Sequence, residues 1–314
     1  MKTKINKDII ERVKGLNPTL FIKKAELSDA DLFVNLFNTY YTRKTSSSYF
    51  YWQFFECPFP STLFMVFDGN ILIGFFGVKI YPLNNNSNAG FAVDFLIDKI
   101  YRNKGIAFLL YEHVIEFCAE NKATCLTALP NVFGNSAFKS LGFKSLGRID
   151  TLEIDIFKKN KKIDCIETAI NTNEKRLHIG FKKDEHYRMW RFKLNPLYIY
   201  KKITLEDNCF CMTKIFTDPV TKLSFGDIVD IQFECITEVS RLVDMVINEM
   251  FLQNIKTLTI WALPHTLLYK ILIEKGFMNQ IQERYFCLKI IDTQFEVLNN
   301  IQLWNLVQAD CEIY

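Results

Sequence analysis

The sequence is poor in histidine, and its cysteines follow no metal-binding or disulfide pattern. There are 4 His and 9 Cys residues among 314, and no Cys-x-x-Cys pair of the kind that many zinc sites use is present. The close pair Cys209 and Cys211 lies inside an apolar run. We therefore expect reduced cysteines that pack as core residues, and no bound metal.

Long hydrophobic runs are also missing. No stretch approaches the roughly 20 apolar residues that a membrane-spanning helix requires. The first residues, MKTKINKDIIERVKG, are charged throughout and contain no apolar signal-like segment. We expect a cytoplasmic protein without a membrane span.

Neither sign of charge is in large excess. The chain has 38 Lys and Arg against 35 Asp and Glu, a formal net charge of +3, and the basic residues are scattered along it. A nucleic-acid-binding surface would need them clustered, so we expect no nucleic-acid partner.

The chain is rich in apolar residues. It contains 49% hydrophobic and 15% aromatic residues, which is ample for buried cores. Its length predicts about two domains.

The first half alternates between strand and helix patterns. The strands are expected at 21–27, 61–83 (a hairpin), 91–100, 124–130 and 145–157, and the helices at 28–41, 45–58, 106–121 and just before Gly142. The connection from strand 91–100 through helix 106–121 to strand 124–130 predicts two parallel neighbours. The fold class is therefore α/β, with a mixed sheet flanked by helices.

The second half repeats this plan. MWRFKLNP resembles YWQFFECP, with Trp190 and Trp52 each six residues before a proline, and TIWALP resembles CLTALP. Several matches in the same order indicate an internal repeat. We expect two domains, 1–157 and 158–314, and we interpret the two tryptophans as packing anchors.

Two short motifs follow successive strands of the first half. The first is Arg102-Asn-Lys-Gly105-Ile-Ala107, and the second runs from Asn131 to Gly142-Phe with Phe138 inside it. In this order of elements they resemble the signatures of the GNAT superfamily of acyl-CoA N-acyltransferases, Arg/Gln-x-x-Gly-x-Gly/Ala and Asn-x-x-Ala-x-x-x-Tyr-x-x-x-Gly-Phe. The resemblance covers about residues 19–157, and the second half is similar to a degenerate copy. It implies two tandem GNAT-like domains, each a central twisted mixed sheet flanked by helices.

The resemblance implies an acetyl-CoA site, and the residue types agree with one. Backbone N–H groups and the positive end of a helix dipole bind pyrophosphate, and a glycine at position 105 allows close approach because it lacks Cβ. An ordinary strand-to-helix turn remains the alternative for the loop alone. A backbone N–H on strand 91–100, near Leu96 or Ile97, is expected to polarise the thioester carbonyl. The expected coenzyme contacts are Leu96, Ile97, Arg102, Asn103, Lys104, Gly105, Ile106, Ala107, Asn131, Asn135 and Phe138.

The resemblance also suggests how protons are handled. Asp94 lies eight residues before Arg102, where family members often carry an acidic residue that faces the acceptor. It is the candidate catalytic base or amine-orienting residue, and a solvent-facing strand residue is the alternative. Phe138 stands where the family often has a Tyr that protonates the leaving thiolate, which Phe cannot do. Tyr111 and His113 lie nearby in sequence, and we interpret them as a packing residue and a solvated helix residue.

The second half departs further from the family pattern. The segment that matches the glycine loop, IQFECITEVSRL at 231–242, contains no glycine. His265 takes the place of Asn131, and Leu272 takes that of Phe138. We expect no phosphate-binding loop there, and a role as a wall of the acceptor pocket or as a scaffold.

The expected function is a single-site N-acyltransferase, with acetyl-CoA as co-substrate and the primary amine of a small molecule as acceptor. Tandem proteins with a Trp-x-x-x-x-x-Pro segment resemble bacterial acyltransferases linked to cell-surface sugar synthesis, which suggests an amino sugar. Two alternatives stay open. One is a non-catalytic acyl-CoA-binding or interaction protein, and the other is an aminoacyl-tRNA-dependent peptidyl-type transferase, against which the diffuse charge and the intact loop argue. The sequence determines neither the acyl chain length nor the oligomeric state.

Overall fold

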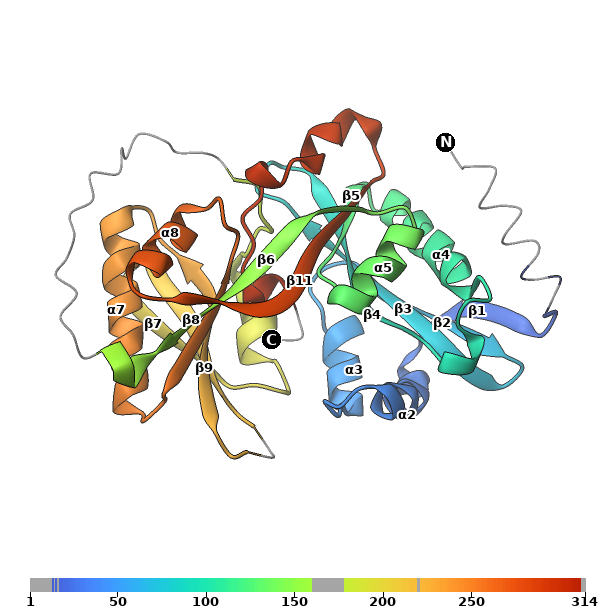
Figure 1. Ribbon diagram of the computed structural model, residues 1–314. Helices are drawn as coiled ribbons and strands as arrows, with labels where there is room; N and C mark the ends of the chain where they lie inside the picture. Colours follow the sequence, from blue (N-terminus) through green and yellow to red (C-terminus); the bar gives the residue numbers. More distant parts are fainter. Residues whose placement is uncertain (1–12, 14, 16, 160–177, 219–220, 312–314) are drawn as a thin grey trace.

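In the computed structural model, which describes residues 13, 15, 17–159, 178–218 and 221–311, the chain forms one mixed sheet with helices packed on it (Figure 1). The order of the eleven strands in these residues is β1-β2-β3-β4-β5-β11-β6-β10-β9-β8-β7. None of the helices in the described ranges is both long and apolar enough to cross a bilayer. The strands are β1 (Leu20–Lys24), β2 (Ser61–Asp68), β3 (Ile71–Pro82), β4 (Asn88–Ile97), β5 (Ala123–Ala128), β6 (Lys144–Asp155), β7 (Tyr200–Glu206), β8 (Cys209–Thr217), β9 (Ser224–Gln232), β10 (Thr257–Ala262) and β11 (Met278–Ile290).

The α-helices of the first half follow the expected order, and β4 and β5 are parallel as predicted from their crossover helix. β4 ends at Ile97 rather than at residue 100. There Asp98 caps a short 3-10 turn by accepting a hydrogen bond from the N–H of Ile100 at 3.0 Å. The α-helices are α2 (Ala30–Tyr40), α3 (Ser47–Phe54), α4 (Ile106–Glu120), α5 (Val132–Ser140), α6 (Glu185–Arg188), α7 (Ile236–Leu252) and α8 (Leu267–Glu274).

The same order of elements occurs twice. From α3 to β6 the chain runs helix, three strands, helix, strand, helix, strand, and from α6 to β11 it does so again. In both halves the third of these strands pairs in parallel with the fourth, β4 with β5 and β9 with β10. The internal similarity seen in the sequence therefore corresponds to a repeated arrangement of elements.

The two halves exchange their last strands. β6, made by the first half, pairs with β10 and β11 of the second half, while β11 pairs with β5 and β6. β6 and β11 run side by side across the middle of the molecule (Figure 1). Among the described residues, no first-half strand pairs with β6. The sheet therefore continues without a break from one half to the other.

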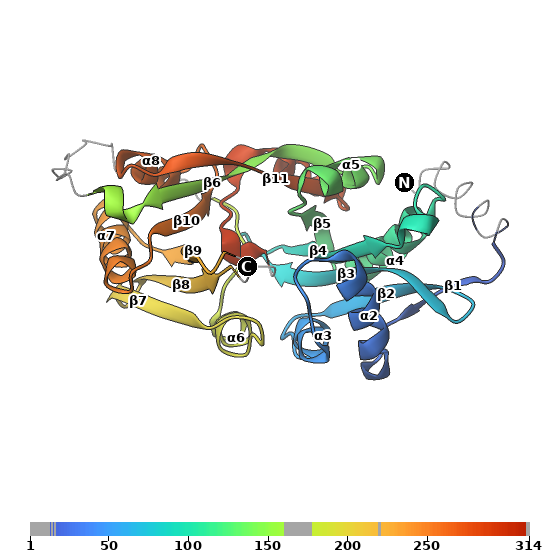
Figure 2. The same cartoon turned by 60° about the horizontal axis from the view of Figure 1, so that its bottom comes forward.

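The predicted packing anchors meet below this junction, where α3 and α6 approach each other (Figure 2). The rings of Trp52 and Trp190 stack with centroids 4.7 Å apart, and both residues are buried. Each indole N–H donates to the main-chain carbonyl of the other tryptophan, at 2.9 and 2.8 Å. The ammonium of buried Lys79 lies 4.1 Å from the Trp190 ring. This reciprocal pair ties the two halves together, so the interpretation as packing anchors is confirmed.

Candidate active site

β4 pairs with β5 only over the first four residues of β4. Their pairing ends at Phe91 and Thr127, although β4 continues to Ile97. On its other edge β4 stays paired with β3, but one extra residue lies between Val93 and Leu96, which is a β-bulge. β5 ends at Ala128, so beyond Phe91 the edge of β4 that faced β5 has no strand partner among the described residues.

Asp94 lies in the bulge, and its backbone is in the left-handed region with φ 43°. This conformation is uncommon for a residue other than glycine, and such positions are frequent at functional sites. Two side chains of α3 donate hydrogen bonds to its carboxylate, Tyr49 Oη at 3.1 Å and Gln53 Nε2 at 3.4 Å. Gln53 in turn accepts a hydrogen bond from the buried ammonium of Lys79 at 2.8 Å. The carboxylate is thus oriented by neutral donors that are themselves held in place.

Two further side chains bring polar groups close to the bulge. Tyr41 Oη donates to the carbonyl oxygen of Phe95 at 3.3 Å, and burial, with the negative charge of Asp94, raises the pKa of Tyr41 above its ordinary value. Burial disfavours the charge of Arg43, but its electrostatic interactions with Tyr49 and Asp94 outweigh burial and raise its pKa. At neutral pH the surroundings of the carboxylate therefore contain a neutral tyrosine and a charged arginine.

The glycine loop forms the N-terminus of α4. Gly105 is the N-cap residue with φ 81°, and Asn103 also has a positive φ of 61°. No side chain caps the helix at Gly105, and the first N–H groups of any α-helix have no partner within the helix. Arg102 Nε donates to the carbonyl oxygen of Ile97 at 3.0 Å, which ties the loop to the end of β4. The side chain of Ile106 is buried, so that residue can offer a ligand only its backbone.

The residues of the second motif are engaged within the protein. Asn131 is the N-cap of α5 and accepts a hydrogen bond from the N–H of Gly134 at 2.9 Å. Asn135 is buried and accepts a hydrogen bond from the thiol of Cys287, on β11, at 3.1 Å. Asp94, Leu96 and Ile97 lie on β4, and the 102–107 loop connects the end of β4 to α4. The Asn135 side chain instead contacts the exchanged strand β11.

Phe138 is buried among other aromatic rings. Its ring centroid lies 4.8 Å from that of Phe143 and 5.9 Å from that of Phe95, next to the bulge. Tyr111 is also buried, 6.0 Å from Phe143, and burial raises its pKa. His113 is 42% exposed on α4. The interpretations of Tyr111 as a packing residue and of His113 as a solvated helix residue are confirmed.

The second half has no equivalent glycine loop, and a carboxylate occupies the start of its helix. The Glu238 side chain accepts hydrogen bonds from the N–H groups of Glu234 and Cys235, at 2.9 and 3.2 Å. These bonds lower the pKa of Glu238, as expected for an anion at a helix N-terminus. The N-terminus of α7 is therefore neutralised by the chain itself, which agrees with the expectation that this segment binds no phosphate.

The structure changes one assignment in the second half. The helix α8 begins one residue later than expected, and Thr266, not His265, is the N-cap residue that corresponds to Asn131. His265 instead places its Nε2 atom 3.0 Å from the carbonyl oxygen of Trp304. Leu272, the expected counterpart of Phe138, is buried in the core. α8 is thus one residue shorter than α5, with eight residues against nine.

Sequence reasoning missed Tyr41, Arg43, Tyr49 and Gln53, all of which lie near the Asp94 carboxylate. A partial signal was present, because Tyr49 and Gln53 are four residues apart and so share one face of a helix. The partner of that face is set by tertiary packing, which the sequence pattern does not contain.

Comparisons with known proteins agree with this geometry. Residues 30–143, just over a third of the chain, match the family model described as the acetyltransferase (GNAT) family. The comparison with curated proteins gave no match. The fold is similar to that of a probable N-acyltransferase from Enterococcus faecalis (TM-score 0.64, 9% identity, covering 88% of this chain and 74% of that one). It is also similar to that of a GCN5-related N-acetyltransferase from Kribbella flavida (TM-score 0.60, 11% identity, covering 87% and 71%). The similarity to the acetyltransferase (GNAT) family is therefore confined to residues 30–143, and the two solved structures share the fold of most of the chain.

Proposed function

We propose that this protein transfers an acetyl group from acetyl-CoA to the primary amine of a small molecule, at a single site in the first half. The observation that carries this proposal is the bulge of β4, where Asp94 adopts a left-handed conformation at the point where β4 has left β5. The uncapped start of α4 follows directly along the chain. The unpaired edge of β4 carries a carboxylate in its bulge and leads to a helix N-terminus that can bind an anion. This arrangement suits the binding of an amine and of a coenzyme thioester.

The coenzyme pyrophosphate would be bound by the backbone N–H groups of residues 102–107, with Arg102 and Lys104 at the rim. Asn103 and Gly105 supply the positive-φ turns that aim this backbone. A backbone N–H on the unpaired edge of β4, near Leu96 or Ile97, would polarise the thioester carbonyl. These roles use backbone groups, which explains why the side chain of Ile106 can be buried.

The chemical step is direct attack in a ternary complex. The amine nitrogen bonds to the carbonyl carbon, the carbon–sulfur bond breaks, and coenzyme A leaves as the thiolate. Asp94 takes the proton of the attacking amine, directly or through a water molecule. A thiol of pKa near 8.5 is a tolerable leaving group without an acid, so Phe138 does not prevent the reaction. Tyr49 and Gln53 orient the carboxylate for this role.

The test is calorimetric titration of the full chain with acetyl-CoA and with free coenzyme A, followed by turnover assays on a panel of small amines. Amino sugars head the panel. We expect one coenzyme molecule per chain, and release of free thiol with at least one amine. Binding without turnover on any amine would favour the acyl-CoA-binding alternative. Absence of coenzyme binding would overturn the proposal, and salt-dependent binding of aminoacyl-tRNA would favour the peptidyl-type alternative.

A further inference from the structure

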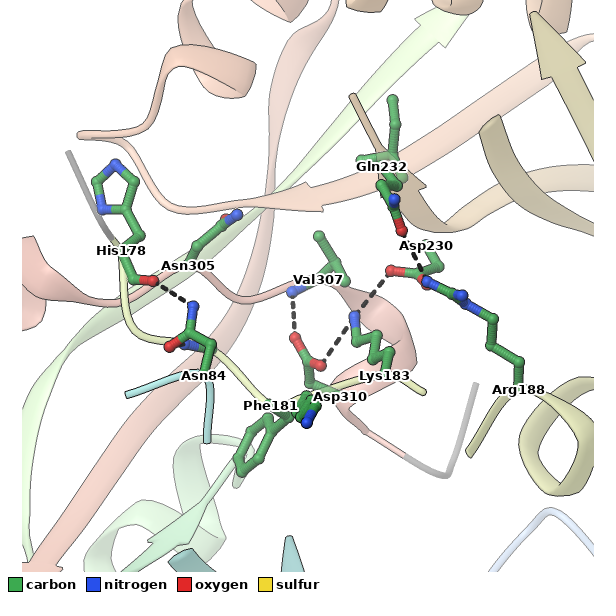
Figure 3. Close-up of a pocket in the computed structure, with 13 residues that line it drawn as sticks. Asn84, His178, Phe181, Lys183, Arg188, Asp230, Gln232, Asn305, Val307 and Asp310 are labelled. Atoms are coloured by element: carbon green, nitrogen blue, oxygen red, sulfur yellow. Dashed lines mark hydrogen bonds and ion pairs between the residues drawn. The ribbon is translucent and has the colours of Figure 1, made fainter. Parts of the chain in front are cut away.

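A cavity of about 340 Å³ lies in the second half, where β9 ends (Figure 3). Four segments form its walls besides β9. They are residues 178–183 before α6, Arg188 at the end of α6, the C-terminal segment (residues 300–311), and Asn84 after β3 of the first half. Pockets for small molecules typically start at about 300 Å³. Because Asn84 belongs to the other half, an occupant would contact both halves of the chain.

The position of this cavity follows from the internal repeat. Asp230 lies on β9, which holds the place of β4, and β9 loses its pairing with β10 after Ile228. The aligned segments GFAVD and GDIVD put Asp230 at the position of Asp94. The C-terminal segment packs against β9, and it is buried at Trp304 and at residues 306–311. The cavity is therefore the second half's counterpart of the site around Asp94, narrowed by the chain's own C-terminal segment.

The carboxylate in this cavity is not arranged for catalysis. Lys183 Nζ lies 2.7 Å from Asp230 Oδ1 and 3.0 Å from Asp310 Oδ1, and the N–H of Val307 donates to the other Asp310 oxygen at 2.7 Å. Although burial disfavours its charge, these carboxylates raise the pKa of Lys183. Asp230 is therefore paired with an ammonium, whereas Tyr49 and Gln53, which donate to Asp94, are neutral. The ion pair makes Asp230 a poor proton acceptor for an amine.

The remaining charge in the cavity is positive. Its lining contains three cationic side chains, Lys182, Lys183 and Arg188, and two carboxylates, Asp230 and Asp310. Lys183 pairs with both carboxylates. Among the described residues no carboxylate forms an ion pair with Lys182 or Arg188. Three cations and two carboxylates give the lining a net formal charge of +1.

Arg188 has an unused donor. Its Nη2 donates to Gln232 Oε1 at 2.7 Å, and its guanidinium lies 5.0 Å from the Phe210 ring centroid. The Nε atom is buried and has no hydrogen-bond partner among the described residues. A buried donor on a charged group without a partner is costly, and an oxyanion would satisfy it. Figure 3 shows Arg188 and Gln232 on one side of the cavity and Asn84 and His178 on the other.

We propose that this cavity is a second ligand site, which binds a small molecule through a carboxylate or phosphate group on Arg188, with Lys182 at its rim. It is a binding site and not a second catalytic centre. The 102–107 loop has no counterpart in the second half, and the charge of Asp230 is paired with that of Lys183. The ligand is polar, since Asn84, Gln232 and Asn305 also line the cavity. By contacting both halves it stabilises their association.

The test is calorimetric titration of the full chain with succinate and, separately, with inorganic phosphate, with coenzyme A present in excess to fill the first-half loop. We expect one additional site for at least one of these anions. Arg188→Gln should weaken that binding about tenfold or more, while Arg241→Gln, an exposed arginine of α7, should leave it unchanged. Succinate alone would assign a carboxylate ligand, and phosphate alone a phosphate ester.

A second variant covers the case in which Arg188→Gln does not fold. Lys182→Gln changes only an exposed cation at the rim, and we expect it to weaken anion binding a few-fold while coenzyme A binding is unchanged. The proposal is overturned if neither anion binds the wild-type chain in the presence of coenzyme A. It is equally overturned if the folded variants bind the anions as the wild type does.

Discussion

At the scale of single residues, the contrast between Asp94 and Asp230 separates a candidate base from a structural ion pair. Asp94 accepts hydrogen bonds from the neutral side chains of Tyr49 and Gln53, and the charged Arg43 lies in its surroundings. Asp230 is bound to an ammonium at 2.7 Å. The same residue type on equivalent strands therefore has different chemistry, because its immediate partners differ.

Asp94→Asn should lower turnover about 100-fold or more, because an amide cannot take the proton of the attacking amine. Acetyl-CoA affinity should stay within about twofold of wild type, since in the proposed arrangement the carboxylate faces the acceptor and not the coenzyme. Steady-state kinetics and calorimetry measure the two quantities. Asp98→Asn is the matched control, because Asp98 only caps a 3-10 turn. Equal losses of turnover and of coenzyme binding in D94N would contradict the assignment.

The cysteines provide a prediction about reactivity. Burial raises the pKa of the Cys287 thiol to about 11, so at pH 8 only about one molecule in a thousand carries the thiolate there. Cys235 is exposed at the start of α7. We expect iodoacetamide at pH 8 to alkylate Cys235 and to leave Cys287 intact until the chain is denatured, as measured by peptide mass spectrometry. Rapid alkylation of Cys287 in the native protein would contradict the packing of β11 on α5.

At the scale of elements, the two central helices begin in opposite ways. α4 starts at a glycine with φ 81° and has no side-chain cap. α7 starts at Cys235 and is capped by the Glu238 carboxylate of its own first turn. One helix N-terminus is open to an external anion and the other is already occupied. The two helix starts, at equivalent places in the repeat, therefore differ in whether a side chain of the protein itself occupies them.

Gly105→Asp should reduce coenzyme A affinity about 100-fold or more, because it places a carboxylate where the pyrophosphate is proposed to bind. Gly69→Asp is the matched control. Gly69 also has a positive φ, 55°, and space for a Cβ, but it lies in the β2–β3 turn. The two variants therefore carry a similar backbone penalty and differ in their place in the fold. An unchanged coenzyme affinity in folded G105D would remove the loop assignment.

Much at this scale could be predicted from the sequence. Apolar patterns and turn residues predicted the strands and helices of the first half within a few residues. The position of Gly105 between a predicted strand and a predicted helix indicated that it lies at the start of the helix. The hydrogen bonds of Tyr49 and Gln53 to Asp94 could not be predicted, since they depend on how α3 packs on β4. The strand exchange could not be predicted either. The sequence of a strand does not specify whether its partner comes from the same half or from the other half.

At the scale of the whole molecule, the exchange means that the predicted boundary near residue 157 does not separate two complete sheets. Without the second half, β5 would lose its partner β11, and β6 would have no strand beside it. The stacked Trp52 and Trp190 would also be separated. The folding of each half therefore depends on the other, although each has its own set of elements.

A fragment of residues 1–157 expressed alone should aggregate or fail to bind acetyl-CoA, because it exposes the edge of β5 and an unpaired β6. Co-expression with residues 158–314 should restore a soluble complex that binds one coenzyme molecule. Size-exclusion chromatography and calorimetry provide the measurements. A monomeric 1–157 fragment with wild-type coenzyme affinity would show that the exchange is dispensable.

The exchange also has a consequence for how the protein is made. During translation β5 emerges early, but β11, its partner, leaves the ribosome only after nearly the whole second half has been synthesised. Domains usually fold in order from the N-terminus as they emerge, whereas the sheet of the first half includes β11 and is complete only when this last strand has been made. Division of the coding sequence at the repeat boundary would separate β5 from its partner strand.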